Sequence, residues 1–338
     1  MALKLSFILP CYNVERYIAE CLDSIYAQDM SEEDYEVICV NDCSTDDTRS
    51  IIFDYSQRHS NLTLIDHVEN LTAGGARNTG IEVSQGEYIW FVDPDDMIVL
   101  NSARVVYEMA KEKDVDVLMF NYETVDETNH HIKKDTSFSD SDILVGQDFV
   151  VKYYSNQFSR LAIVWRCLFR TSFLKEKELW YPRMCKAQDV SFLWKVMLVS
   201  EKVSSVSGVY YTYRRNPHSV TKKRLDAHVM FSERMLFANE ICKLLEDKDL
   251  NILAIIRSDM ERSVKWCANS NLNLIKQMSI KERNRYFDEI KSNWEAVSRV
   301  RPYMNRKHKR LFSVAGGRRL WLLNVKVLVA LDEHKKNE

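Results

Sequence analysis

The 338-residue chain lacks most features that would place it in a special class of protein. It has only 8 Gly and 5 Pro, which excludes a collagen-like or low-complexity chain. Apolar residues make up 46% and charged residues 28%, a globular composition that excludes bulk disorder. The best candidate for a membrane span, Leu320 to Leu331, has 12 residues and contains Asn324 and Lys326. Because a span needs about 18 apolar residues, we predict none.

The 8 cysteines form no C-x-x-C pair, which argues against a zinc ribbon or a thioredoxin-type redox site. No signal peptide is expected, because the N-terminus runs straight into a strand-like segment. We therefore expect a cytoplasmic protein with reduced thiols. Cys39, Cys43 and Cys185 are expected to behave as small apolar residues.

The formal net charge of −2 predicts no general attraction to nucleic acid. The charge is nevertheless uneven: from Arg301 to the end, ten Lys or Arg accompany three Asp or Glu. That segment also holds Trp321 among aliphatic residues, a combination that suits peripheral contact with an anionic membrane surface. A solvated basic helix, a core helix and a dimer contact are the alternatives.

Short apolar runs alternate with helical patterns in the first third of the chain. The predicted strands are 5–9, which Pro10 should end, 35–40, 62–65 and 88–92, and the predicted helices are 15–28, 44–57 and 75–83. Strands separated by helices of this length predict an α/β fold with a mainly parallel sheet flanked by helices.

The rest of the chain continues the sheet and then changes character. We predict strands at 115–121, 165–169 and 203–213, a helix at 190–199 and a loop over 124–142. Beyond residue 220 the pattern is helical throughout. We therefore predict two domains, an α/β domain over residues 1–220 and a helical C-terminal region over residues 221–338.

Polar side chains follow three of the predicted parallel strands. Ligands bind beyond the carboxyl ends of such strands, and there the sequence places Asn13 and Glu15, then Asp42, then the run Asp93-Pro94-Asp95-Asp96. Any one Asp could be only a turn or cap residue. Three carboxylates in four residues repel one another, and a divalent cation would offset that repulsion. Because Mg²⁺ and Mn²⁺ take one or two carboxylates together with phosphate oxygens, the run predicts a diphosphate ligand.

The usual phosphate-binding loops are absent. The chain has no G-x-x-x-x-G-K-[ST] motif, and Gly74 to Gly80 does not form a G-x-G-x-x-G fingerprint. We interpret Gly74-Gly75 as a flexible turn that enters a helix. Arg77 then either faces the crevice, where it can bind phosphate, or pairs with an acidic neighbour inside the domain.

Four blocks together resemble the family-two glycosyltransferases of the GT-A fold. They are Ser6 to Glu15, Val40 to Asp46, Gly74 to Gly80 and Phe91 to Asp96. Their order and spacing match the family, and the resemblance covers about residues 4–220. Cys43 departs from it, because the family usually has Gly at this position, which should restrict the turn.

The resemblance implies a role for each matching residue. Asp42 would bind the nucleotide base, most often uracil, and Asp93 would contact the ribose. Asp95 would hold the Mn²⁺ or Mg²⁺ that bridges the diphosphate, and Asp96 would support it. The remaining residues of the implied nucleotide-binding set are Pro10, Tyr12, Asn13, Glu15 and Arg77.

Further along, Val164 to Phe169 and then Gln188-Asp189 resemble the family's acidic pair before a helix. Asp189 stands at the position of the general base, while Gln188 replaces the usual Glu. A base is needed because an acceptor hydroxyl must lose its proton as it attacks the anomeric carbon. Taken alone, Asp189 could be only a helix N-cap.

The block Tyr210 to Thr221 resembles the family's closing segment. In it, Arg214, Arg215 and His218 could close over the diphosphate, and His218 is either a metal ligand or a surface residue. Gln157 to Leu161 only partly echoes the Gln-x-x-Arg-Trp motif of processive synthases, so we expect a non-processive enzyme.

We therefore predict an inverting, metal-assisted hexosyltransferase of bacterial polysaccharide biosynthesis. It would move sugar from a nucleotide sugar, most often a UDP-sugar, to a glycan or lipid-linked acceptor. The alternatives are a catalytically inactive nucleotide-sugar-binding scaffold, for which Gln188 is the only support, and a nucleotidyltransferase. The latter should carry a Gly-rich loop with a basic residue near the first strand, and Pro10 to Glu15 has none.

Overall fold

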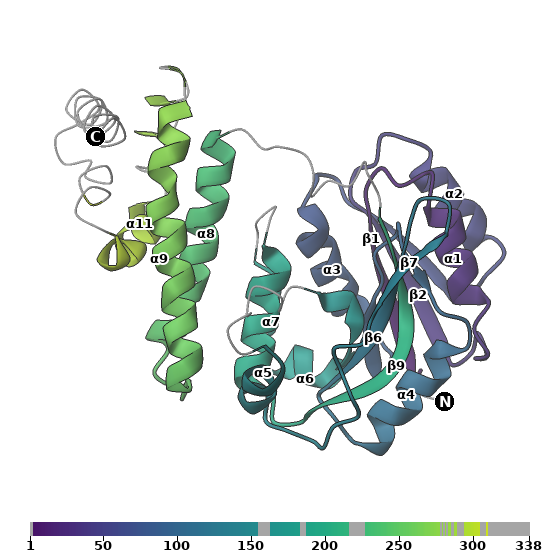
Figure 1. The fold of residues 1–338 in the computed structure, drawn as a ribbon. Coiled ribbons are helices and arrows are strands. Elements are labelled where there is room, and N and C mark those ends of the chain that lie inside the picture. Colours follow the sequence, from purple (N-terminus) through teal and green to yellow (C-terminus); the bar gives the residue numbers. More distant parts are fainter. Residues whose placement is uncertain are drawn as a thin grey trace. The chain divides into compact units, whose positions relative to one another are not determined.

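The computed structural model describes residues 3–154, 163–182, 187–215, 227–277 and 294–304, together with residues 279, 281, 283, 284, 287, 288 and 309. The chain divides into two compact units, Met1–Val220 and Thr221–Glu338. The first unit holds the sheet and the second is built from helices (Figure 1).

A nine-stranded mixed sheet forms the centre of the first unit, in the order β3-β2-β1-β4-β8-β6-β9-β5, with β7 paired to β6 beside this path. The strands β3, β2, β1 and β4 are parallel to one another, whereas β8 is antiparallel to both of its neighbours. The bounds are β1 Leu5–Cys11, β2 Tyr35–Asn41, β3 Leu62–Asp66, β4 Tyr88–Phe91, β5 Met97–Ile98, β6 Val117–Val125, β7 His131–Asp135, β8 Cys167–Arg170 and β9 Val203–Arg214.

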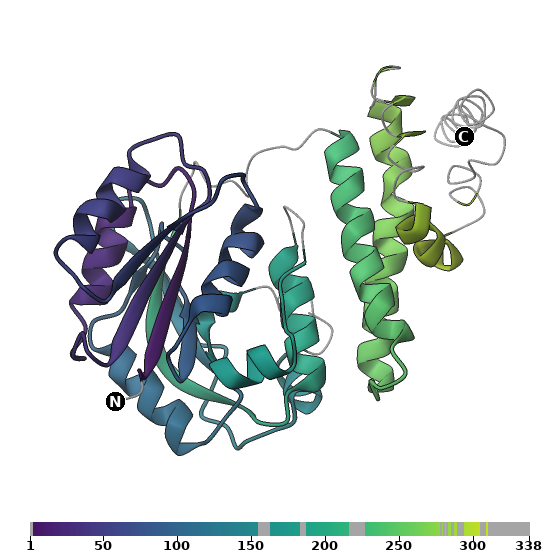
Figure 2. The same cartoon turned by 180° about the vertical axis from the view of Figure 1, so that it is seen from behind.

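Helices cover both faces of this sheet (Figures 1 and 2). On one face lie α1 (Ile18–Tyr26), α2 (Thr48–Ser56) and α4 (Ser102–Glu112), and on the other lie α3 (Thr72–Val83) and α6 (Thr171–Glu176). On the α3 side, α5 (Gly146–Tyr154) packs against α7 (Gln188–Val199), and the short helix η2 (Val164–Arg166) precedes β8. The predicted fold class, a mainly parallel sheet flanked by helices with further helices after it, is confirmed.

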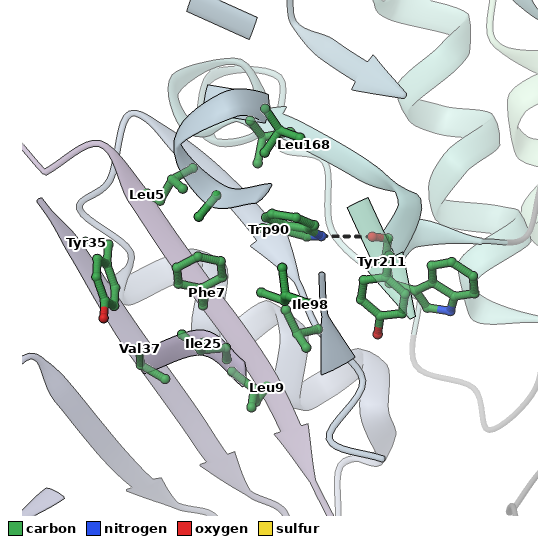
Figure 3. Close-up of a cluster of buried hydrophobic side chains, with 14 of the residues drawn as sticks. Leu5, Phe7, Leu9, Ile25, Tyr35, Val37, Trp90, Ile98, Leu168 and Tyr211 are labelled. Atoms are coloured by element: carbon green, nitrogen blue, oxygen red, sulfur yellow. Dashed lines mark hydrogen bonds between the residues drawn. The ribbon is translucent and has the colours of Figure 1, made fainter. Parts of the chain in front are cut away.

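The central strands are apolar on both sides because each side meets helices. Leu5, Phe7 and Leu9 of β1 join one core cluster with residues of α1 and α4. Figure 3 shows Leu5 and Phe7 among these side chains, beside Trp90, whose indole N–H donates to the Trp165 carbonyl at 2.9 Å. Burying each large apolar side chain of this kind contributes about 1.5–3 kcal/mol to stability.

The opposite face is packed by aromatic rings and by a close helix approach. Phe91 of β4 meets the rings of Tyr181 and Phe192 at 5.7 and 6.1 Å, and Tyr181 stacks on Phe192 at 4.0 Å. A Cβ atom on Gly80 would collide with the Ile8 side chain, so glycine lets α3 lie close to β1. These contacts fix α3 and α7 against the carboxyl end of β4.

Several predicted elements differ from the structure, and three of the differences concern the sheet and its rim. Part of the predicted loop 124–142 forms β7, an exposed edge strand whose polar residues hid it. Helix α3 begins at Thr72, so Gly74 and Gly75 lie in its first turn instead of a flexible turn. Pro10 lies inside β1 and does not end it. The pairing of β1 with β4 ends at Ile8 and Phe91, followed by the bond from the Val92 N–H to the Ile8 carbonyl. Pro10 faces the same side but lies beyond this pairing, so its missing N–H breaks no bond of the ladder.

The second unit is helical over its described residues. Helix α8 (Ala227–Glu246) packs against α9 (Ala254–Gln277), and α11 (Trp294–Val300) packs on α8 and leads into the short helix η4 (Arg301–Tyr303). The Arg299 guanidinium binds Glu246 and Asn239 of α8 at 3.0 and 2.9 Å. No helix among the described residues is long and apolar enough to cross a membrane. Trp321 and its basic neighbours Arg318 and Arg319 lie outside the described residues.

Candidate active site

The carboxyl ends of three neighbouring parallel strands form one rim of the sheet. Cys11 pairs with Asn41 at the ends of β1 and β2, and β4 ends beside Ile8. The segments that follow these strands therefore begin side by side, as the strand order predicts.

The loops after β1 and β2 are joined by hydrogen bonds to backbone N–H groups. The Asn13 Oδ1 accepts from the Thr45 N–H at 2.8 Å, and the Glu15 Oε2 accepts from the Asp47 N–H at 3.0 Å. In return, the Asp46 carboxylate accepts from the Glu15 N–H at 3.1 Å. The Asn13 and Glu15 side chains are thus used between the loops. Of the predicted nucleoside-pocket residues, Pro10 is buried in β1 and Tyr12 is 41% exposed.

Two residues of this loop pair adopt left-handed backbone conformations. The φ angles are 52° at Asn13 and 64° at Cys43. Asn tolerates this region well, whereas Cys adopts it at a cost of about 1 kcal/mol relative to Gly. The Cys43 thiol, which is half-buried, donates to the His67 carbonyl at 3.2 Å.

Asp42 is buried at the start of the loop after β2, with 2% of its surface exposed. Its N–H donates to the Cys11 carbonyl at 2.8 Å. Its Oδ1 accepts from His67 Nδ1 at 2.7 Å and from the Leu71 N–H at 2.8 Å. His67 belongs to no recognisable sequence motif, because it is a single histidine that follows a short strand. Only the fold brings it to Asp42.

Arg77 of α3 joins two carboxylates that the sequence separates by about a hundred residues. Its Nη2 donates to Asp93 Oδ1 at 2.7 Å and its Nη1 to Asp189 Oδ1 at 2.9 Å. The guanidinium is buried and lies 5.3 Å from the centre of the Tyr181 ring. Its Nε is buried without a hydrogen-bond partner. Arg77 therefore holds Asp93, after β4, and Asp189, at the start of α7, on either side of one fixed cation.

Asp189 has an environment that suits proton transfer near neutral pH. Burial raises the pKa of its carboxyl to about 6, with Arg77 opposing the rise and Asp93 adding to it. Its side chain keeps 30% of its surface exposed, so the carboxylate is open to solvent on one side. The N-cap of α7 is Ala187, so Asp189 is the second residue of the helix and not its cap.

Gln188 closes the gap between α7 and α3. Its Oε1 accepts from the Gly74 N–H at 2.9 Å and lies 3.4 Å from the Thr72 hydroxyl. A Cβ atom on Gly74 would overlap this amide, so a larger residue there would displace the Gln188 side chain. Gln188 thus anchors the helix start that carries Asp189.

The three acidic residues after β4 have different surroundings. Asp93 pairs with Arg77, whereas Asp96 is buried and accepts from the Tyr211 hydroxyl at 2.9 Å and the Arg214 N–H at 2.8 Å. Burial, with the charges of Asp95 and Asp93, raises the pKa of the Asp96 carboxyl well above its usual value. The Asp95 side chain is half-exposed between them.

This arrangement fits a divalent cation that also binds phosphate. Over the described ranges, no group of three or more His, Cys, Asp or Glu is placed to hold a metal ion. Mg²⁺ and Mn²⁺ bound with a nucleotide need only one or two protein carboxylates. Asp95 has the exposure for that position, because Asp93 faces Arg77 and both Asp96 oxygens accept hydrogen bonds inside the protein.

The cations predicted to close over the diphosphate are only partly described. The Arg214 guanidinium is buried, binds Glu20 Oε2 at 2.6 Å and lies over the Tyr17 ring. Arg215 is exposed, with its N–H bound to the Val125 carbonyl. His218 and the segment Gln157 to Leu161 lie outside the described residues.

Comparison with known proteins adds a family and a fold. Residues 6–176, half of the chain, match the sequence profile described as Glycosyl transferase family 2. The poly(ribitol-phosphate) beta-glucosyltransferase of Bacillus spizizenii is 28% identical over 311 residues, which cover 87% of this chain and 45% of that enzyme. The glycosyltransferase GlyG of Streptococcus pneumoniae is 28% identical over 267 residues, which cover 75% of this chain and 85% of GlyG. The chain thus spans less than half the length of the Bacillus enzyme.

Two solved structures share the fold. Residues 1–349 of Staphylococcus aureus TarS, in complex with UDP-GlcNAc, align with a TM-score of 0.63 at 21% identity, covering 99% of this chain and 93% of that one. The mannosyltransferase PcManGT of Pyrobaculum calidifontis, in complex with GDP-Man and Mn²⁺, aligns with a TM-score of 0.52 at 17% identity, covering 98% and 86%.

Proposed function

Because this chain belongs to glycosyl transferase family 2, we propose that it transfers a hexose-type sugar from a uridine-diphosphate sugar to a hydroxyl group of a polymer acceptor. The observation that carries the proposal is the pairing of Arg77 with both Asp93 and Asp189, which puts a base candidate next to the acidic run after β4. The choice of donor is supported by TarS, whose structure holds UDP-GlcNAc. The acceptor class follows from the poly(ribitol-phosphate) transferases among the relatives.

In this proposal, Asp189 removes the proton of the acceptor hydroxyl as its oxygen attacks the anomeric carbon. A new C–O bond forms on one face of the sugar while the bond to the nucleoside diphosphate breaks on the other, so the configuration inverts. A pKa of about 6 leaves Asp189 ionised at neutral pH and still basic enough to accept the proton.

Some of the other predicted residues bind the donor. Asp42 accepts a hydrogen bond from the base, Tyr12 packs on it, and Asp93 contacts the ribose. Asp95 would hold the cation, for which Mn²⁺ in PcManGT is a precedent. A divalent cation supplies positive charge that stabilises the departing diphosphate.

Arg77 has a different role from the one that the family resemblance implies. Its guanidinium is buried and its two Nη groups already donate to carboxylates. We therefore place it as the residue that positions Asp189 relative to Asp93, and not as a direct ligand of the phosphates.

The first test is calorimetric titration of UDP, GDP and dTDP, each with and without Mn²⁺, on wild type and Asp95→Ala. Mn²⁺-dependent UDP binding that Asp95→Ala loses is the expected result. Asp142→Ala is the matched control, since Asp142 is an exposed loop residue away from the rim. No nucleotide binding by folded wild type would overturn the proposal.

The second test measures transfer from UDP-glucose and UDP-GlcNAc to poly(ribitol phosphate) and to other glycan polymers. Sugar transfer that Asp189→Asn removes is the expected result. UDP binding without transfer to any acceptor would favour the inactive scaffold, and transfer at a normal rate by Asp189→Asn would overturn the assignment of the base.

A further inference from the structure

His67 lies between Asp42 and Thr79 and hydrogen-bonds to both. Its Nδ1 is 2.7 Å from Asp42 Oδ1, and its Nε2 is 2.9 Å from the Thr79 hydroxyl. The His67 side chain is 9% exposed. Its N–H donates to the Asn41 carbonyl at 3.0 Å, where β3 runs beside β2. The ring is therefore fixed from the backbone as well as from both nitrogens.

The chemistry of the three groups sets the direction of each hydrogen bond. An ionised carboxylate only accepts, so His67 Nδ1 donates to Asp42. In a neutral imidazole the other nitrogen then accepts, so the Thr79 hydroxyl donates to Nε2. The Asp42 carboxylate thus fixes the tautomer of His67, and the Thr79 hydroxyl holds the ring in place by donating to Nε2.

The result is an asymmetric carboxylate. Two donors, His67 Nδ1 and the Leu71 N–H, reach Asp42 Oδ1 at 2.7 and 2.8 Å. Across the part of the chain that the structure describes, no donor reaches Oδ2. A rotation of the carboxylate would break both bonds to Oδ1, so Oδ2 keeps one direction.

We propose that His67 and Thr79 are positioning residues that hold Asp42 Oδ2 toward the base of the donor nucleotide and set its selectivity. A fixed acceptor favours a ring with an N–H, such as N3 of uracil, and repels the unprotonated N3 of cytosine. This inference rests on the proposed function, in which Asp42 binds the base, and adds the two residues that make the binding selective.

The test compares UDP and CDP affinities, in Mn²⁺, for wild type, His67→Leu, His67→Asn and Thr79→Val. His67→Leu should weaken UDP binding by about tenfold to a hundredfold, because a hydrogen bond that orients a charged acceptor is lost. CDP affinity should change little, so the UDP/CDP ratio falls toward one. His67→Asn can place an amide N–H where Nδ1 was and should restore most of the ratio. Thr79→Val should lower the ratio by about threefold to tenfold, since Nε2 loses the partner that holds the ring in place.

His59→Leu is the matched control. His59 also binds a carboxylate through Nδ1, that of Glu32 at 3.1 Å, and it stacks on Tyr26 instead of contacting Asp42. It should leave both affinities unchanged. Thr79 is half-buried and lines a cavity of about 450 Å³ on the outer side of α3, so its valine variant should not disturb a packed core.

The outcomes separate this inference from the proposed function. Wild type that prefers UDP, with the same UDP/CDP ratio in His67→Leu and Thr79→Val, would overturn the inference alone. Equal loss of UDP and CDP binding in folded His67→Leu would also overturn it, because a purely structural role predicts that result. Wild type that binds neither nucleotide would overturn both proposals.

Discussion

At the ends of β1 and β2, side-chain oxygens accept hydrogen bonds from backbone N–H groups, whereas around Arg77 full charges meet one another inside the protein. In the first region the acceptors Asn13 and Glu15 lie at an exposed loop pair, and each bond is one of several. In the second region one buried cation serves Asp93 and Asp189. We therefore expect the loops to keep their shape when one hydrogen bond is removed. Removal of the Arg77 cation should instead disrupt the whole cluster.

The difference shows in the pKa values of the acidic residues. Burial opposes ionisation of Asp46, but hydrogen bonds from Thr48 and from the backbone lower its pKa below the usual value. At Asp189 burial outweighs the attraction of Arg77 and raises the pKa to about 6. Asp46 is thus tuned to stay ionised and support the loops, while Asp189 is tuned to exchange a proton.

The largest expected effect is on catalysis at the charged region. Asp189→Asn should lower the transfer rate by about 10²–10⁴-fold, the usual contribution of a positioned base. Wild-type transfer should fall about tenfold per pH unit below pH 6, since only the ionised carboxylate accepts the proton. Steady-state kinetics from pH 5 to 8 measure both, with the exposed Asp148→Asn as control. A flat profile would remove Asp189 from the proton transfer.

Arg77→Met should have the largest effect on stability. It leaves Asp93 and Asp189 facing each other without their shared cation, and breaking a buried ion pair in this way costs about 3–5 kcal/mol. Urea unfolding measures the loss. Arg104→Met, which removes an exposed ion pair with Asp29, should cost no more than about 1 kcal/mol. Similar losses in the two variants would contradict the expectation that the ion pairs of buried Arg77 stabilise the fold more than the exposed pair of Arg104.

Asp189 should also link stability to pH. Its folded-state pKa of about 6 lies above the usual value near 4, so the folded protein binds the proton more tightly than the unfolded chain does. The resulting stability is present below pH 4 and is lost as the pH rises through 6. Between pH 5 and 8, wild type should lose about 1 kcal/mol of unfolding free energy relative to Asp189→Asn. A wild type that gains unfolding free energy relative to Asp189→Asn as the pH rises would contradict this prediction.

Asn13→Ala tests the loop region and should cost about 1 kcal/mol. It removes the acceptor for the Thr45 N–H, in an exposed setting where water replaces part of the lost bond. It also removes the tolerance of Asn for the left-handed conformation. Chemical denaturation measures the change, and a loss as large as that of Arg77→Met would show that the loops are as fragile as the charged cluster.

The smallest expected effect comes from Cys43→Gly. Relief of the left-handed conformation is offset by greater freedom of the unfolded chain and by loss of the thiol bond, so the unfolding free energy should change by less than about 1 kcal/mol. Cys43→Val should lose clearly more, because a β-branched residue tolerates this conformation poorly. Equal values for the two variants would mean that backbone strain at residue 43 is negligible.

Local patterns predict β1, β2 and β4 because these strands are apolar, and α1 because it is amphipathic. They place Asp42 and Asp93 at the rim because both follow strands, whereas Asp189 is predicted as the base only from the resemblance to the family. They do not reveal His67, whose contact with Asp42 depends on the pairing of β3 with β2. They also leave open whether Arg77 faces a ligand or a neighbour. Its two partners come from the segment after β4 and from α7, and only tertiary packing brings these to α3. Strand β7 is missed because an exposed edge strand has no apolar face to detect.

The half-buried thiol of Cys43 allows this rim to be labelled with a thiol reagent. Among the described cysteines, the other six are buried, and burial raises the pKa of Cys242 and Cys267 to about 12, so those two react slowly with alkylating reagents. Cys43 adjoins Asp42 in the chain, so a dye attached to its sulfur would sit beside the proposed base-binding carboxylate. The native chain thus offers its own attachment point for an optical sensor of nucleotide occupancy, without an engineered cysteine at the rim.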